Sequence, residues 1–144
     1  AEDYAHCGYP ADAAAILLCE LDGGVTEVAA QRARVEALLR DYGASEVRVS
    51  RDEAERLGFW KGRKSAFPAI GRIAPDYYCM DGTIPRRALS QVLTRIAELS
   101  VEFGLPVANV FHAGDGNLHP LIAYDANDDE QLHRAEALGA RILE

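Results

Sequence analysis

Two histidines flank a glycine-rich turn in the segment His112-Ala-Gly-Asp-Gly-Asn-Leu-His119. The pair Asp115-Gly116 predicts a two-residue type I′ hairpin turn, because that turn needs positive φ at both central positions. In that register His112 pairs directly with His119, and directly opposed residues point to the same face of a sheet. Two adjacent imidazoles could bind a divalent metal. The alternative is that both histidines are solvated or only structural.

A catalytic metal site normally needs a third protein ligand besides an open position. Asp115 is near in sequence, but the turn itself explains an aspartate before a glycine, since aspartate tolerates positive φ. His6 and His133 are distant in sequence. The sequence therefore predicts two metal ligands, His112 and His119, and no convincing third ligand.

A second group of residues could bind an anion. Arg63 follows the aromatic pair Phe59-Trp60 and precedes an irregular stretch with two prolines. An arginine in that place could bind a small carboxylate through two parallel hydrogen bonds, although basic surface residues often serve only solubility. The sequence has no Ser/His/Asp or Cys/His arrangement and no phosphate-binding loop, so no catalytic residue is predicted.

The elements that must position these residues follow from hydrophobic periodicity. Apolar runs and alternating patterns predict five strands, at 13–21, 45–50, 76–81, 106–113 and 117–125. Helical spacing and capping signals predict four helices, at 25–42, 52–62, 83–103 and 128–144. This order predicts an α+β fold, a ferredoxin-like antiparallel sheet with helices packed on one face.

Length and charge limit the function. The 144 residues suffice for one domain, and the formal net charge of -8 argues against binding nucleic acid or an anionic membrane. Three widely spaced cysteines form no disulfide framework, which favours reduced thiols in the cytoplasm. The chain opens without methionine and its last helix reaches no stop signal, so we expect a piece of a longer protein.

The histidine segment resembles the C-terminal domain of FAD-linked 2-hydroxyacid oxidases and dehydrogenases. The resemblance is carried by the motif from Asn109 to Ile122, supported by Phe59-Trp-Lys-Gly-Arg-Lys64 and by Asp76-Tyr-Tyr-Cys-Met-Asp-Gly-Thr-Ile-Pro-Arg86. It is strongest toward FAD-linked subunits of the glycolate oxidase type, and D-lactate dehydrogenases share the histidine motif. Residues 1–144 would then be part of this C-terminal domain, without the N-terminal FAD-binding domain and the C-terminal remainder.

This resemblance implies a mechanism and a set of partners. His112 and His119 would bind a divalent metal (zinc, manganese or iron) that holds a small 2-hydroxy acid, and Arg63 would contact the substrate carboxylate. FAD, bound mainly by the absent domain, would receive hydride as the 2-oxo acid forms. Partners would be the FAD-binding domain and further oxidase subunits, through which a cytoplasmic protein could lie peripherally at the inner membrane.

Two departures from the family pattern shape the expectation. The family's third metal ligand is a glutamate in a Gly-Glu-His-Gly segment, and the chain ends before any such segment. Members acting on D-2-hydroxyglutarate have a lysine where this chain has Cys79, which argues against that substrate. We therefore expect residues 1–144 alone to be inactive and to self-associate. The rival interpretation is a stand-alone α+β metal-binding or interaction module without redox activity.

Overall fold

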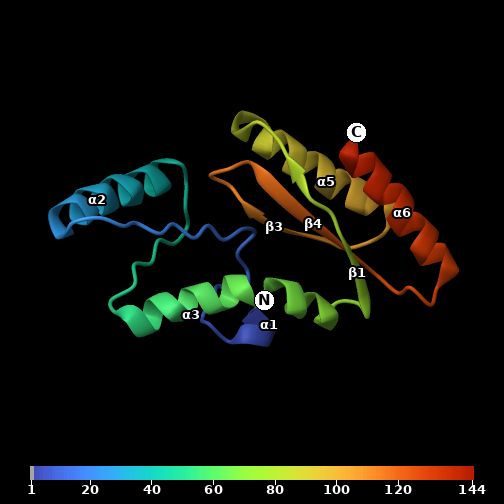
Figure 1. Ribbon diagram of the computed structural model, residues 1–144, viewed down its shortest axis with the longest axis horizontal. Coiled ribbons are helices and arrows are strands. Elements are labelled where there is room, and N and C mark those ends of the chain that lie inside the picture. The colour runs from blue at the N-terminus through green and yellow to red at the C-terminus, as the bar shows by residue number, and fades with distance from the viewer. Residues whose placement is uncertain (1) are drawn as a thin grey trace.

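The computed structural model describes residues 2–144 as a four-stranded antiparallel sheet with helices on both of its sides (Figure 1). The longer helices are α2 (Val25–Asp41), α3 (Glu53–Lys64), α5 (Leu89–Phe103) and α6 (Asp129–Leu143), and the short ones are α1 (Glu2–Ala5), α4 (Ala66–Ala69), η1 (Ile70–Arg72) and η2 (Arg86–Ala88). The strands are β1 (Asp76–Cys79), β2 (Gly82–Thr83), β3 (Val107–His112) and β4 (Asn117–Tyr124).

Strand β4 is the centre of the sheet, because every other strand pairs with it. On one edge it pairs antiparallel with β3, and on the other edge it pairs with β1 and then β2. Cys79 is opposite Leu121 and Gly82 is opposite Leu118, so β1 and β2 share one register along β4. They therefore act as one interrupted strand, and the sheet is effectively three strands wide.

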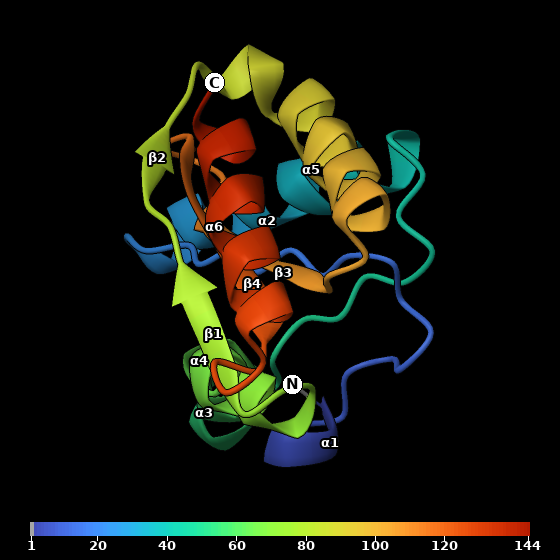
Figure 2. The ribbon, with the colours of Figure 1, turned by 90° about the vertical axis from the view of Figure 1, so that its right-hand side faces the viewer.

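The two long C-terminal helices cover one face of the sheet. Helices α5 and α6 lie side by side over it (Figures 1 and 2). Ile122 of β4 points to this face and is fully buried. The core around it consists of Met80, Leu99, Leu105, Ala135 and Leu138. Burying a leucine-sized side chain contributes about 1.5–3 kcal/mol, and this cluster has more buried side chains than the one on the opposite face.

A smaller core lies on the opposite face, which corrects the expectation of helices on one face only. Leu121 and Ala123 alternate with Ile122 along β4 and therefore point away from α5 and α6. They pack with Ile70 of η1, and Phe67 of α4 closes the cluster at its side. The α3–α4–η1 segment is the element beneath the sheet in Figure 1.

Two predicted strands, 13–21 and 45–50, are not strands in the structure. Both stretches are irregular, and the first is mostly exposed, with Ile16 46% and Leu17 58% accessible. An apolar pattern reports a preference for burial, but a strand also needs a neighbour with free backbone groups to pair with. The α+β class and the antiparallel sheet are confirmed, whereas the observed strand order does not establish a ferredoxin-like topology.

The four predicted helices are present, but the one predicted at 83–103 begins only at Leu89, because Gly82–Thr83 pairs with β4 as β2 and the 3₁₀ turn η2 follows it. Asp52 caps α3 by accepting from the Glu55 backbone N–H at 2.8 Å, and Gly104 ends α5 in the left-handed region at φ 63°. Helix α2 has no buried residue and lies apart from the sheet, at the left of Figure 1. No helix between residues 2 and 144 has the length and apolar character that crossing a membrane requires.

Candidate metal-binding site on the β3–β4 hairpin

The hairpin has a four-residue loop, not the two-residue turn predicted from Asp115-Gly116. His112 pairs with Asn117, and His119 pairs with Val110. The backbone N–H groups of Asp115 and Gly116 both donate to the His112 carbonyl at 3.1 Å. The direct His112–His119 pairing was therefore wrong by two residues.

The backbone of the loop explains the error. A type I′ turn would need positive φ at Asp115, but Gly116 is the one loop residue with positive φ, at 72°. A Cβ at Gly116 would also run into the Ile84 carbonyl. Ile84 donates its backbone N–H to the Gly116 carbonyl at 2.9 Å. The glycine is thus required by a contact with the chain after β2, which local turn statistics cannot reveal.

The two histidines nevertheless share one face of the sheet. A shift of two residues preserves the face on which each side chain lies, because side chains alternate with a period of two. The imidazole ring centroids of His112 and His119 are 5.9 Å apart, with an interplanar angle of 73°. The prediction of two neighbouring imidazoles is confirmed, and they are diagonal rather than directly opposed.

The two imidazoles differ in environment. His112 is exposed at the end of β3, whereas His119 is partly buried. The Nδ1 atom of His119 is buried and has no hydrogen-bond partner among the described residues. A buried polar atom without a partner costs about 1–3 kcal/mol, so this nitrogen is suited to a ligand that would satisfy it. The nitrogen donor set therefore fits a divalent metal.

An aromatic side chain from the segment beneath the sheet borders the pair. The Phe67 ring of α4 meets His119 edge-on, with centroids 6.4 Å apart. Phe67 also meets Tyr77 of β1 at 6.4 Å. These rings form an apolar wall on one side of His119, and they leave the His112 side open to solvent.

Arg63 lies one helical turn before Phe67. Ser65 keeps a right-handed helical backbone between α3 and α4, so Arg63 and Phe67 are related as i and i+4 on one continuous helical path. The hydrogen bonds and ion pairs found within residues 2–144 include none from the Arg63 guanidinium, but its charge lies near Tyr9, where it opposes the rise that burial causes in the pKa of that hydroxyl. The structure brings Arg63 to the segment that borders His119, but no direct contact joins the arginine to the histidines.

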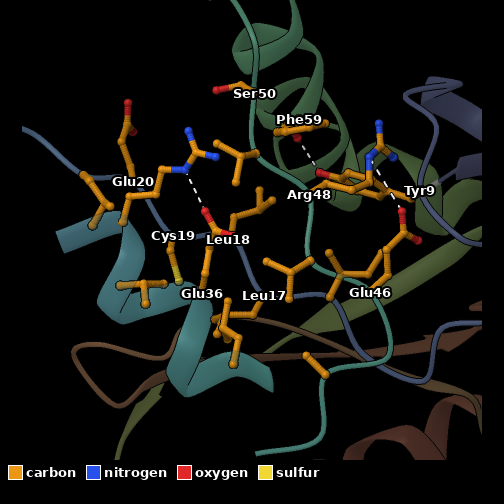
Figure 3. A pocket seen from close by; sticks show the side chains of 18 of the residues that line it. Tyr9, Leu17, Leu18, Cys19, Glu20, Glu36, Glu46, Arg48, Ser50 and Phe59 are labelled. Carbon is orange, nitrogen blue, oxygen red and sulfur yellow. Dashed lines mark hydrogen bonds and ion pairs between the residues drawn. The ribbon is translucent and has the colours of Figure 1, made fainter. Parts of the chain in front are cut away.

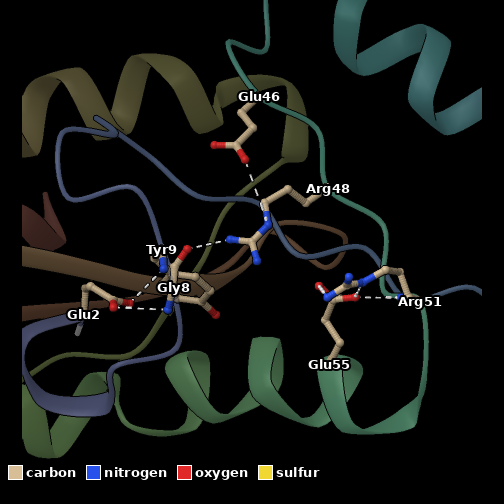
Figure 4. A network of polar contacts seen from close by, with 7 residues as sticks. All are labelled: Glu2, Gly8, Tyr9, Glu46, Arg48, Arg51 and Glu55. Carbon is tan, nitrogen blue, oxygen red and sulfur yellow. Dashed lines mark hydrogen bonds and ion pairs between the residues drawn. The ribbon is translucent and has the colours of Figure 1, made fainter.

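Residues 2–9 hold α3 in place. The Glu2 carboxylate accepts from the backbone N–H groups of Gly8 and Tyr9 (Figure 4) and from that of Cys7. These hydrogen bonds, with the one from Tyr9 first, lower the pKa of Glu2 to about 2. The Tyr9 hydroxyl donates to the Phe59 carbonyl of α3. Arg48 joins the same network by donating to the Gly8 carbonyl (Figure 4).

Two polar residues on the histidine face were missed by sequence reasoning. Asn117 is the cross-strand partner of His112, and its side-chain Nδ2 donates to Asp81 Oδ1 at 2.7 Å. Asp81 lies between Cys79, which is opposite Leu121, and Gly82, which is opposite Leu118. The shared register of these pairs places Asp81 opposite His119 of β4. Burial and then the Asp81 carboxylate raise the pKa of the Cys79 thiol. The available signal was the position of Asp81 at the end of the strand predicted at 76–81, next to Gly82.

The remaining sequence candidates lie elsewhere. His133 is on α6, which covers the opposite face, and His6 is at the chain's N-terminal end. Within the described part of the chain, no three His, Cys, Asp or Glu side chains come together as a metal site. Cys7, Cys19 and Cys79 are free thiols, as predicted. The described residues thus supply two ligands and no third.

A cavity in the described part of the chain is remote from the histidines. It has a volume of about 530 Å³ and lies among the 13–21 stretch, the 44–50 stretch, α2 and the aromatic pair of α3 (Figure 3). Arg48 stacks over the Phe59 ring at 5.0 Å on one wall. Apolar side chains such as Leu17 and Leu18 point toward it (Figure 3). It is a space between loosely packed elements, and it contains neither imidazole.

Comparisons with known proteins agree with the motif. The family model for FAD linked oxidases, C-terminal domain, matches residues 1–144. The chain is 63% identical over 144 residues to glycolate oxidase subunit GlcD of Escherichia coli (strain K12), covering 100% of this chain and 29% of that protein. It is 32% identical over 143 residues to glycolate oxidase subunit GlcD of Bacillus subtilis (strain 168), covering 99% and 30%.

A D-lactate dehydrogenase is a more distant relative. The chain is 31% identical over 130 residues to a probable mitochondrial D-lactate dehydrogenase of Danio rerio, covering 88% of this chain and 26% of that protein. The chain thus spans less than a third of the length of these curated relatives.

Proposed function

Because the chain belongs to the family of FAD-linked oxidase C-terminal domains, we propose that it is the substrate- and metal-binding part of an FAD-dependent 2-hydroxyacid dehydrogenase. The reaction is the oxidation of a small 2-hydroxy acid, of the glycolate or D-lactate type, to the 2-oxo acid. FAD, bound mainly by a domain outside residues 1–144, supplies the hydride acceptor when bound.

The observation that carries the proposal is the pair of imidazoles on one sheet face. Their ring centroids are 5.9 Å apart, and the buried Nδ1 of His119 has no partner among the described residues. His112 and His119 would hold a divalent metal, zinc, manganese or iron, which as a Lewis acid would lower the pKa of the substrate hydroxyl. By analogy with the family, a glutamate outside this chain completes the ligand set.

Arg63 is the proposed partner of the substrate carboxylate. Its guanidinium forms none of the ion pairs found within residues 2–144, and Arg63 lies one turn from Phe67, whose ring meets His119 edge-on. Arginine binds a carboxylate through two parallel N–H donors. This arrangement would hold the acid end of the substrate while the hydroxyl end lies toward the histidines.

The proposed substrate is a small hydroxy acid with one carboxylate. Cys79 is on the histidine face, since it pairs with Leu121, and it offers no cation for a second carboxylate. This supports a monocarboxylic hydroxy acid rather than 2-hydroxyglutarate. The bacterial relatives are named as subunits of glycolate oxidase, so we propose glycolate as the first substrate to test. We also propose that the parent protein assembles with further oxidase subunits, at a cytoplasmic site or at the inner membrane.

The test is a flavin-reduction assay of the protein expressed from the complete parent reading frame. Glycolate and D-lactate should bleach the flavin absorbance, 2-hydroxyglutarate should not, and a metal chelator should suppress the reduction. Residues 1–144 alone should give no flavin-linked turnover. Reduction that is indifferent to both chelator and the His112→Ala/His119→Ala double variant would contradict the proposed metal role.

A further inference from the structure

The Asp81–Asn117 pair is a polar contact on the histidine face that neither the sheet ladder nor the core explains. The Asn117 Nδ2 donates to Asp81 Oδ1 at 2.7 Å, across 36 residues of sequence. Asn117 is opposite His112, and it precedes His119 by two residues on β4. A single asparagine side chain therefore neighbours both imidazoles, along one strand and across to the next.

The register shows why the carboxylate is on the same face. Cys79 pairs with Leu121 and Gly82 pairs with Leu118, and the Met80 backbone N–H donates to the Pro120 carbonyl at 3.0 Å between them. This continuous register places Asp81 opposite His119. Opposed residues share a face, so the carboxylate, the amide and both imidazoles lie together.

The hydrogen bond fixes the orientation of the amide. An ionised carboxylate only accepts hydrogen bonds, so the amide nitrogen of Asn117 must be the atom next to Asp81. The amide oxygen is then turned away from Asp81, and it accepts no hydrogen bond from another residue of the described chain. The amide oxygen of Asn117 is thus an acceptor without a partner among the described residues, on the sheet face that carries both imidazoles.

We infer that Asp81 is a positioning residue that holds Asn117, so that the amide oxygen of Asn117 serves the outer coordination sphere of a divalent metal at His112 and His119. The inference rests on the proposed function, because it requires the metal. The role suits a group that is not itself a ligand, since Asp81 and the two histidines do not form a three-ligand cluster. Mutating a group that hydrogen-bonds to a metal ligand changes the metal affinity by about 10–100-fold, and we expect the lower end of that range for Asp81, because it acts through Asn117.

The experiment measures Zn²⁺ binding by calorimetry to the complete, metal-stripped protein from the parent reading frame. In Asp81→Asn, the new side-chain amide at position 81 can both donate and accept hydrogen bonds. The Asn117 amide could then face it with either its nitrogen or its oxygen, so its orientation is no longer fixed. We expect it to weaken Zn²⁺ binding by about 10-fold or more. Asn117→Ala should do the same, and combining the two should add little. Asp81→Glu keeps the acceptor and should restore affinity to within about threefold.

The matched control is Asp115→Asn, which removes one negative charge from the hairpin loop without touching Asn117. It should leave the affinity within about twofold. In Co²⁺-loaded protein, Asp81→Asn should shift the visible absorption bands while the unfolding midpoint in urea stays unchanged, which separates positioning from a structural effect.

The set of variants distinguishes failure of the positioning role from failure of the proposed metal site. If His112→Ala/His119→Ala abolishes Zn²⁺ binding but Asp81→Asn and Asn117→Ala leave it intact, only the positioning role is overturned. Equal weakening by Asp81→Asn and Asp115→Asn also overturns it, because the effect is then bulk charge. If the double histidine variant binds Zn²⁺ as tightly as the parent, or the parent binds none, both proposals fall.

Discussion

Gly116 lies directly against the backbone carbonyl of Ile84, and Ile84 returns a hydrogen bond to the Gly116 carbonyl at 2.9 Å. This contact joins the loop of the histidine hairpin to the chain that follows β2. It sets the position of the loop, and with it the offset between His112 and His119 along the two strands.

Replacing Gly116 with alanine should destabilise the fold. The new Cβ would overlap backbone atoms, and φ of 72° costs an L-residue about 1–2 kcal/mol before any overlap. We expect a loss of more than about 2 kcal/mol in the free energy of urea unfolding. Gly114→Ala is the control, because no atom lies within 4 Å of its added Cβ. Equal stability of the two variants would contradict the contact.

Arg63→Lys in the complete protein should weaken substrate capture. Lysine keeps the charge but loses the two parallel donors, and a charged hydrogen bond contributes about 1.5–3 kcal/mol. We expect kcat/KM for glycolate to fall about 10–100-fold, with most of the change in KM. Lys64→Ala, which removes the exposed neighbouring cation, is the comparison. A fall in kcat/KM for Lys64→Ala as large as that for Arg63→Lys would assign the effect to general charge.

Acidification should loosen the attachment of residues 2–9. The pKa of Glu2 is lowered from its usual 4.5 to about 2 by the hydrogen bonds it accepts. Its contribution to stability is therefore complete above pH 4.5 and is lost as the pH falls toward 2. The protection factors of the Cys7, Gly8 and Tyr9 amides, which compare exchange with the intrinsic rate at each pH, should therefore fall over this window. Glu2→Gln should remove the pH dependence, and Asp3→Asn should retain it.

Residues 1–144 in isolation should self-associate. Large apolar side chains are exposed outside the sheet core, with Leu17 58% and Val25 91% accessible. Sedimentation velocity should show association that grows with concentration, and Leu17→Glu should reduce it. Val101→Glu places the same charge at a solitary apolar position on α5 that is 84% accessible, and it should have little effect. A monomer at millimolar concentration would contradict this prediction.

The sequence predicted what local chemistry determines. The Asp52 cap, the spacing of α5 and the Gly104 stop are signals within a few residues, and each helix was found where they indicated. The shared face of His112 and His119 was also predictable, because it depends only on the two-residue period of a strand.

The failures were all non-local. The loop length depends on Ile84, which is more than 30 residues from Gly116, so a dipeptide preference at Asp115-Gly116 gave the wrong register. The stretches 13–21 and 45–50 have strand-like patterns, but a strand exists only with a pairing partner. The hydrogen bond between Asp81 and Asn117 likewise becomes visible only when β4 brings two distant segments together.

The central place of β4 has a consequence for how the site can be lost or altered. This one strand pairs with every other strand, contributes Ile122 and Leu121 to the two opposite cores, and carries both Asn117 and His119. Its amide protons should therefore exchange with solvent only through global unfolding. The placement of His119 and Asn117 on one face is then as stable as the fold itself. A molecule that retains its sheet retains the shared face of the imidazole pair, and substitutions such as Asp81→Asn act only on how side chains are oriented there.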